Sequence, residues 1–135
     1  MGWSALIVDD SATLRSTLRA VLESKGVAVI EAEDGMEGLS GAREQAVDVI
    51  VADIHMPVMD GVKMIREIRC LEQHKHTPIF VLSTDSMSAR LEEGRKAGAT
   101  AWLIKPTNPE LLWSGIERVL QRAASAARTR EETSK

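Results

Sequence analysis

Residues 47–53 read Val-Asp-Val-Ile-Val-Ala-Asp, a short run that is apolar at nearly every position and closes on a carboxylate. Consecutive β-branched residues favour an extended backbone, and a strand without polar alternation is typical of a parallel sheet covered on both faces. We therefore predict a buried strand over Val47–Ala52, with Asp53 at its carboxyl end.

Similar apolar runs and stretches with helical spacing alternate along the rest of the chain. Leu14, Leu18 and Leu22 lie at i, i+4 and i+8, which is one stripe of an amphipathic helix. Strands that alternate with helices predict right-handed βαβ units. The expected fold class is α/β, a doubly wound parallel sheet of five strands with five helices. The other strands are expected at Ala5–Val8, Val27–Glu31, Pro78–Leu82 and Thr100–Ile104.

Several helix boundaries carry capping signals. Asp34 precedes Glu37 by three residues and Thr107 precedes Glu110 by three, and both pairs have the spacing of an N-terminal capping box. Asp60 is expected to begin the third helix because a glycine and an apolar stripe follow it.

The last two helical stretches are less regular than the others. The fourth, Ser86–Ala97, has few apolar positions (Met87, Leu91 and Ala97), so we expect low local stability and movement there. From about Arg122 the sequence turns polar without an apolar stripe. We predict one domain over residues 1–122 and a polar C-terminal tail over 123–135 that frays.

The composition excludes several classes of protein. A formal net charge of −3 argues against binding to nucleic acid, and no apolar run approaches the roughly 20 residues that span a bilayer. Cys70 is the single cysteine, so an internal disulfide is excluded and a cytoplasmic location is expected. We expect Cys70 to be at least half-buried in a helix.

Polar side chains follow four of the five predicted strands. Asp9-Asp10 follow the first strand, Asp53 the third, Ser83-Thr84 the fourth and Lys105 the fifth. In an open parallel sheet, ligands bind beyond the carboxyl ends of the strands. We therefore expect these side chains to line one pocket.

The chemistry of this pocket fits phosphoryl transfer. Three neighbouring carboxylates repel one another, and a hard cation such as Mg²⁺ relieves the repulsion. Mg²⁺ also neutralises a phosphoryl group that a carboxylate attacks, while Lys105 offers a mobile point charge and Ser83 a hydroxyl. Asp53 is the candidate nucleophile because it stands alone at the end of its strand, and an aspartyl phosphate is an established covalent strategy.

In their order along the chain, these motifs resemble those of response regulator receiver domains of two-component systems, the CheY-like single-domain type of chemotaxis. The resemblance covers residues 4–122 and includes His-Met-Pro-Val-Met-Asp-Gly at 55–61. It implies the strand order 2-1-3-4-5. It also implies a phosphoprotein of phosphorelay signal transduction, which takes its phosphoryl group from a histidine sensor kinase or a histidine phosphotransfer protein. Such a chain is a signalling domain and not an enzyme.

The resemblance assigns metal ligands and phosphoryl contacts. Asp10 and Asp53 would bind Mg²⁺ directly, Asp9 would reach it through water, and the backbone carbonyl of His55 would be a further ligand. Ser83, with Thr84 beside it, would be the switch hydroxyl. Lys105 would hold the phosphoryl group, with a cis bond before Pro106.

The resemblance also implies an output surface for a downstream protein. Trp102, three residues before Lys105, takes the place of the switch aromatic. Trp113 lies one residue, or about 100°, from the stripe position Leu112, so we expect an exposed indole. The two indoles would form a docking patch on the fourth helix, fifth strand and fifth helix. His74 and His76 are expected to be solvated, and Met59 and Met64 to fill the core.

Other functions with the same layout fit less well. A phosphatase with an aspartyl intermediate needs a second carboxylate two residues after the nucleophile, where this chain has His55. A flavin-binding module needs a phosphate loop after the first strand, where Asp9-Asp10 would repel a phosphate. Two architectures stay open: a complete single-domain regulator, which we favour, and a receiver cut from a longer protein with a DNA-binding or enzymatic output domain.

Overall fold

The computed structural model describes residues 2–56, 58–84 and 88–133, which form a three-layer α/β fold. Five parallel strands make one sheet in the order β2-β1-β3-β4-β5. The predicted doubly wound sheet is confirmed, and so is the strand order that the resemblance implied. The strands are β1 Ser4–Val8, β2 Ala28–Ala32, β3 Val49–Asp53, β4 Ile79–Ser83 and β5 Ala101–Ile104.

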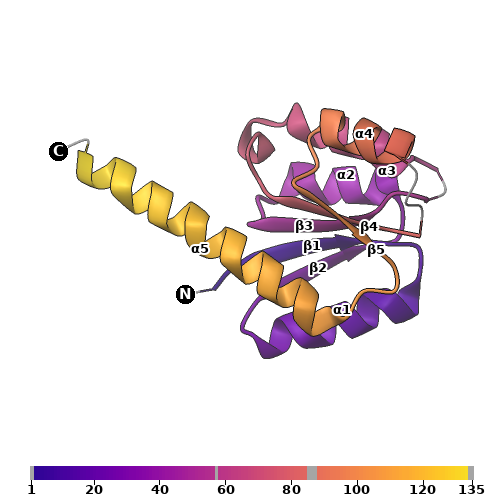
Figure 1. The fold of residues 1–135 in the computed structure, drawn as a ribbon, viewed down its shortest axis with the longest axis horizontal. Coiled ribbons are helices and arrows are strands. Elements are labelled where there is room, and N and C mark those ends of the chain that lie inside the picture. Colours follow the sequence, from indigo (N-terminus) through magenta and orange to yellow (C-terminus); the bar gives the residue numbers. More distant parts are fainter. Residues whose placement is uncertain (1, 57, 85–87, 134–135) are drawn as a thin grey trace.

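Helices cover both faces of the sheet, as Figure 1 shows, with α2, α3 and α4 on one side and α1 and α5 on the other. Each layer encloses its own hydrophobic cluster, one around Ile50 and Ile65 and one around Val51 and Ile116. Neighbouring residues of β3 therefore face opposite layers, which explains why residues 47–53 are apolar without alternation. The helices are α1 Ala12–Ser24, α2 Gly35–Glu44, α3 Gly61–Arg69, α4 Ser88–Ala97 and α5 Pro109–Thr133, with one 3₁₀ turn, η1 Glu72–His74.

Two of the three predicted helix starts are confirmed. Asp34 accepts a hydrogen bond from the backbone N–H of Glu37 at 2.8 Å, and Asp60 caps α3 in the same manner. The prediction of Thr107 as the cap of α5 is wrong. Its hydroxyl donates to the carbonyl of Ile104, and the neighbouring Asn108 caps the helix through the backbone N–H of Glu110.

The described side chains of α4 that are buried are small. Its described portion buries Gly94 and Ala97, whereas Leu91 is 39% exposed. Ser86 and Met87, which the sequence placed at the start of this helix, lie outside the described residues. The C-terminal end of α4 is fastened more firmly, because the Arg69 guanidinium donates twice to the carbonyl of Gly98.

The last helix is longer than the sequence pattern predicted. We expected fraying from about Arg122, but α5 continues to Thr133 and projects beyond the sheet (Figure 1). Alanine-rich sequence has high helix propensity, so an absent apolar stripe leaves the helix uncovered without ending it. The last buried residue of its described part is Leu120. Within the described residues, no helix combines the length and the apolar character that a membrane span requires.

Two predictions about single side chains are wrong. His74 was expected in solvent, yet it is fully buried between the hydroxyl of Thr77 and the carbonyl of Ala42, each 2.9 Å from a ring nitrogen. Cys70 was expected at least half-buried, but α3 ends there and the side chain is exposed. Met59 and Met64 are buried in the core, as predicted.

Candidate functional site

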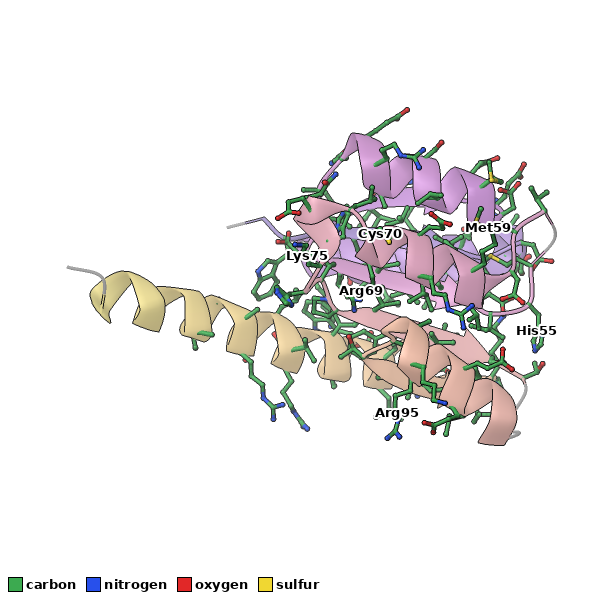
Figure 2. The ribbon with its side chains drawn as sticks, turned by 90° about the horizontal axis from the view of Figure 1, so that it is seen from above. His55, Met59, Arg69, Cys70, Lys75 and Arg95 are labelled. Carbon is green, nitrogen blue, oxygen red and sulfur yellow. The ribbon has the colours of Figure 1, made fainter. Side chains whose placement is uncertain are left out.

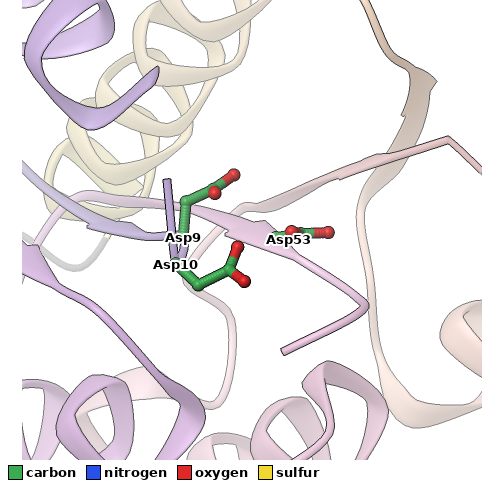
Figure 3. A group of neighbouring side chains, drawn as sticks. All are labelled: Asp9, Asp10 and Asp53. Carbon is green, nitrogen blue, oxygen red and sulfur yellow. The ribbon is translucent and has the colours of Figure 1, made fainter. Parts of the chain in front are cut away.

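Three carboxylates meet at the carboxyl ends of β1 and β3, which are neighbours in the sheet. Oxygens of Asp9, Asp10 and Asp53 all lie within 4.8 Å of one another, and Figure 3 shows the three neighbouring side chains. Asp9 and Asp53 are buried, with 2% and 6% exposure, whereas Asp10 is exposed. The convergence of these residues, predicted from strand ends alone, is confirmed.

A single ammonium group sits between two of these carboxylates. Lys105 Nζ lies 3.0 Å from Asp9 Oδ2 and 3.3 Å from Asp53 Oδ2. The backbone N–H of Lys105 donates to the carbonyl of Ser83 at 2.8 Å, which ties the strand-five end to the strand-four end. The Lys105–Pro106 peptide bond is cis, as the resemblance implied.

Backbone donors fix the orientation of both buried carboxylates. The N–H of Ser11 donates to Asp9 Oδ1 at 2.8 Å, and the N–H of His55 donates to Asp53 Oδ1 at 3.1 Å. Each carboxylate thus has one oxygen held by the backbone and the other turned toward Lys105. In Figure 2, His55 lies at the end of the molecule opposite to the projecting part of α5.

The electrostatics of the site reflect burial and crowding of charge. Burial raises the pKa of Asp53, the charge of Asp9 raises it further, and the ammonium of Lys105 opposes both effects. Burial alone would lower the pKa of Lys105, but its hydrogen bond to Asp9 and the charge of Asp53 outweigh burial and raise it. Three carboxylates with one ammonium therefore leave a pocket that favours a further cation.

The donor set fits a hard divalent cation. Carboxylate oxygens from adjacent strand ends, one of them exposed, match the oxygen ligands and retained waters that Mg²⁺ prefers. A second acidic group, Glu33, Asp34 and Glu37, also clusters, but none of its members is buried, whereas Asp9 and Asp53 are. The first cluster is therefore the better candidate for the metal.

Two hydroxyls complete the edge of the site. Ser83 is the last residue of β4 and is fully buried, and Thr84 follows it on the surface. An open, mostly apolar recess of about 420 Å³ lies beside them, between α1 and the connection from β5 to α5. Its lining comprises Ser11, Leu14, Leu18, Leu82, Thr84, Lys105, Pro106 and Thr107.

Trp102 and Trp113, the two tryptophans of the predicted docking patch, lie on opposite sides of the sheet. Trp102 is partly buried against the α3–α4 side, and a Cβ on Gly94 would lie 2.4 Å from its ring. Trp113 is only 8% exposed and packs on the other side of the sheet, with its ring centroid 6.4 Å from that of Trp3. The prediction of Trp113 as an exposed docking residue is therefore wrong, as is the joint patch of two indoles.

Two residues next to the acidic cluster, Arg15 and Glu31, were not predictable as part of the site. Arg15 Nη1 donates to the backbone carbonyl of Asp9 at 2.6 Å, and Arg15 Nε lies 3.0 Å from a carboxylate oxygen of Glu31. Arg15 follows Asp9 by six residues on the polar side of α1, and no motif distinguishes it from a solvated residue. Only the pairing of β1 with β2 brings Glu31 within its reach.

The chain matches a known family over most of its length. The family model described as the response regulator receiver domain matches residues 5–117. The transcriptional regulatory protein ResD of Bacillus subtilis is 34% identical over 122 residues, which are 90% of this chain and 50% of ResD. The protein PilH of Pseudomonas aeruginosa is 35% identical over 115 residues, which are 85% of this chain and 95% of PilH. The chain thus spans about half the length of one relative and nearly all of the other.

Solved structures agree with these matches. The chemotaxis response regulator CheY4 of Vibrio cholerae superposes with a TM-score of 0.83 at 39% identity, covering 88% of this chain and 99% of CheY4. The receiver domain of the sensor histidine kinase PA1611 from Pseudomonas aeruginosa superposes with a TM-score of 0.78 at 32% identity, covering 90% and 97%. That receiver was solved with a magnesium ion coordinated in its active-site cleft. Fold, acidic cluster and sequence matches agree, and the chain belongs to the family of response regulator receiver domains.

Proposed function

We propose that this receiver domain accepts a phosphoryl group on Asp53, with the help of Mg²⁺, and thereby changes its binding to a downstream protein. The observation that carries the proposal is the buried Asp53 at the end of β3, with an ammonium 3.3 Å away and two more carboxylates beside it. Receiver domains of this family are phosphorylated by histidine kinases and act on downstream targets.

Each residue at the site has a separate role in the phosphoryl transfer. The Asp53 oxygen that faces Lys105 attacks phosphorus, an O–P bond forms, and the P–N bond of the phosphohistidine breaks with its electron pair going to the imidazole. Lys105 moves from the Asp53 carboxylate to a phosphoryl oxygen, and the Ser83 hydroxyl donates to another. The backbone N–H of His55 holds the second Asp53 oxygen throughout.

Mg²⁺ would be held by Asp10, Asp53 and the backbone carbonyl of His55, with Asp9 reaching it through water. Bound there, the ion neutralises charge on the transferring phosphoryl group. Receiver domains bind Mg²⁺ at this acidic cluster, and the magnesium-bound receiver of PA1611 supports the same use here. The chain's own contribution is to hold three oxygen donors close together and to keep two of them buried.

The proposed output surface consists of α4, β5 and α5, with a different set of side chains from the one that the sequence indicated. Leu91 of α4, Ile104 of β5 and Leu111 of α5 are 39%, 46% and 70% exposed. Exposed large apolar residues are uncommon enough to mark a binding surface when they gather on adjacent elements. Trp102 lies beneath this surface and remains the proposed link between Ser83 and α4.

The architecture of the whole protein is part of the proposal. The match to nearly all of PilH supports a single-domain regulator, which we favour. The match to only half of ResD supports the alternative, a receiver joined to an output domain. The full reading frame of the gene distinguishes the two.

A phosphorylation experiment tests the proposed acceptor. Incubation with a small-molecule phosphodonor and Mg²⁺ should add one phosphoryl group, which base removes, and Asp53→Asn should abolish the addition. Removal of divalent ions with a chelator should also abolish it. An Asp53→Asn variant that is labelled as readily as the parent would disprove the assignment.

Metal titration tests the proposed ligands separately. The parent should bind Mg²⁺ weakly, with a dissociation constant on the order of 1 mM, or about −4 kcal/mol. Asp10→Ala should weaken binding more than Asp9→Ala, because only Asp10 is proposed to contact the ion directly. Equal affinities in the parent and both variants would rule out this metal site.

A further inference from the structure

An arginine of α1 hydrogen-bonds to the backbone of the loop that carries Asp9 and Asp10. Arg15 Nη1 donates to the backbone carbonyl oxygen of Asp9 at 2.6 Å, and its side chain is only 14% exposed. On the other side of Asp9, the backbone N–H donates to the carbonyl of Ala32 at 3.1 Å. The backbone of Asp9 is therefore bonded in two directions, to β2 and to α1.

The carbonyl oxygen that Arg15 binds belongs to the peptide group joining Asp9 to Asp10. A peptide group is planar, so fixing its oxygen also fixes the direction in which the chain enters Asp10. This restraint matters more for the orientation of Asp10 than for that of Asp9 or Asp53. Its carboxylate is exposed and accepts no hydrogen bond from the described residues, whereas Asp9 and Asp53 are each oriented by a backbone N–H.

Arg15 is itself held in place by a second residue. Its Nε lies 3.0 Å from a carboxylate oxygen of Glu31 on β2, and the planar guanidinium can make both contacts at once. Arg19 binds the other oxygen of the same carboxylate at 2.7 Å, but it is 42% exposed and, within the described residues, makes no hydrogen bond to Asp9 or Asp10. Arg15 and Arg19 therefore share Glu31 and differ in their contact with Asp9.

We propose that Arg15 is a positioning residue for the metal site, which acts by fixing the Asp9–Asp10 peptide group so that the Asp10 carboxylate faces Asp53. Glu31 is the clamp that holds Arg15 in this orientation. The inference rests on the proposed function, because it assigns a residue that prepares the Mg²⁺ site and touches neither metal nor phosphoryl group. Residues that orient metal ligands in this indirect way typically contribute tenfold or more to metal affinity.

Mg²⁺ titration by calorimetry, in the absence of any phosphodonor, provides the test. Arg15→Gln should weaken Mg²⁺ binding about tenfold, the lower end of the usual range for such residues. Arg19→Gln is the matched control: it removes one positive charge and one Glu31 contact but leaves the Asp9 carbonyl bonded, and its affinity should stay within about twofold of the parent. The amide NMR resonance of Asp10 in the metal-free protein should move in the first variant only.

Two further variants separate positioning from charge and from folding. Arg15→Lys keeps the charge without the fork geometry, so its Mg²⁺ affinity should stay low. If Arg15→Gln does not fold, Glu31→Gln replaces it, and freeing Arg15 from its clamp should weaken Mg²⁺ binding about threefold relative to Arg19→Gln, a part of the usual loss.

Three results would overturn the inference. They are equal Mg²⁺ affinities in the Arg15→Gln and Arg19→Gln variants, full recovery in Arg15→Lys, and parental affinity in Glu31→Gln. A parent protein that binds no Mg²⁺ would remove the proposed function and this inference with it, so the two failures are distinguishable.

Discussion

At the scale of single residues, Val58 has an unusual backbone conformation. It lies in the loop between β3 and α3, and among the described non-glycine residues it alone has a positive φ, of 71°. Cβ sterics make this region costly for an L-residue, by about 1–2 kcal/mol, and a β-branched residue suits it least. The side chain is 77% exposed, so little burial offsets that cost.

Replacing Val58 should therefore stabilise the domain. Asparagine tolerates the left-handed region better than valine, so Val58→Asn should raise the free energy of unfolding by about 0.5–1 kcal/mol in urea titrations. Val58→Ala should gain less, because alanine removes the β-branch but lacks the side-chain amide with which asparagine hydrogen-bonds locally in this conformation. An Asn variant no more stable than the parent would show that the loop carries no strain at this position.

His74 provides the opposite case, a residue that should cost much when removed. His74→Ala removes one hydrogen bond each from the carbonyl of Ala42 and the hydroxyl of Thr77, which keep only longer bonds to Gln73, and it opens a cavity. Thermal or urea unfolding should therefore show a loss of about 3 kcal/mol. His76→Ala is the matched control, because that residue is exposed and its loss should change stability by less than about 0.5 kcal/mol. Equal losses in both variants would contradict the burial of His74.

The contrast between His74 and the acidic cluster shows what the sequence allowed at this scale. Asp9, Asp53 and Lys105 were predictable because parallel strands end at the same edge of a sheet, whatever lies between them. His74 was not, because its partner Ala42 lies 32 residues away on another helix. Trp113 was not either, since it packs against Trp3 at the other end of the chain. Local patterns do not encode such pairs.

At the scale of elements, α4 and β5 can pack closely because Gly94 has no side chain where Trp102 lies against the helix. A Cβ on Gly94 would lie 2.4 Å from Trp102 Cζ3 and 2.9 Å from Cε3, so only glycine allows the indole to lie against the helix. About one turn further along, just past the C-terminal end of α4, Arg69 fastens the carbonyl of Gly98 to α3. Both contacts lie in or next to the C-terminal half of α4, and they hold it against β5 and α3.

Gly94→Ala should displace either the indole or the helix. In a Trp3→Phe, Trp113→Phe background, the emission of Trp102 should change, and the free energy of unfolding should fall despite the better helix propensity of alanine. Gly115→Ala on α5 is the control, because its Cβ would meet Phe80 at an ordinary 3.5 Å and should stabilise by about 0.5–1 kcal/mol. Unchanged Trp102 emission in Gly94→Ala would show that the indole does not depend on the gap at Gly94.

The elements themselves were more predictable than their ends. Apolar runs, helical spacing and capping signals predicted the five strands and five α-helices of the described residues, because burial on both faces of the sheet leaves a strong pattern, whereas the 3₁₀ turn η1 was not predicted. The start of α5 was placed one residue too early, on Thr107 in place of Asn108. Both residue types cap helices, and only the hydrogen bond from Thr107 back to Ile104 selects between them.

At the scale of the whole molecule, α5 has a first part that packs on the sheet and a last part that projects beyond it. Residues 121–126 have no buried side chain, while Ile116 and Leu120 are 0% and 3% exposed. A chain ending after Arg122 should therefore lose less than about 1 kcal/mol of unfolding free energy. A chain ending after Gly115 should lose at least about 3 kcal/mol, because two buried side chains go with it. A large loss in the longer truncated chain would place the domain boundary beyond residue 122.

The proposed function predicts that a phosphoryl group and Mg²⁺ bind next to each other at the Asp53 site. Beryllofluoride with Mg²⁺ imitates an aspartyl phosphate, and it reports the acceptor and the metal ligands in one structure. A competing location exists in the cluster of Glu33, Asp34 and Glu37, whose oxygens are also close together.

A crystal structure of the protein grown with beryllofluoride and Mg²⁺ tests this account most directly. We predict beryllium bonded to a carboxylate oxygen of Asp53, Mg²⁺ in contact with Asp10, Asp53 and the His55 carbonyl, and Lys105 Nζ moved from the carboxylates to a fluorine. Beryllium on any other side chain, or Mg²⁺ bound at Glu33, Asp34 and Glu37 with the Asp53 site empty, would contradict it.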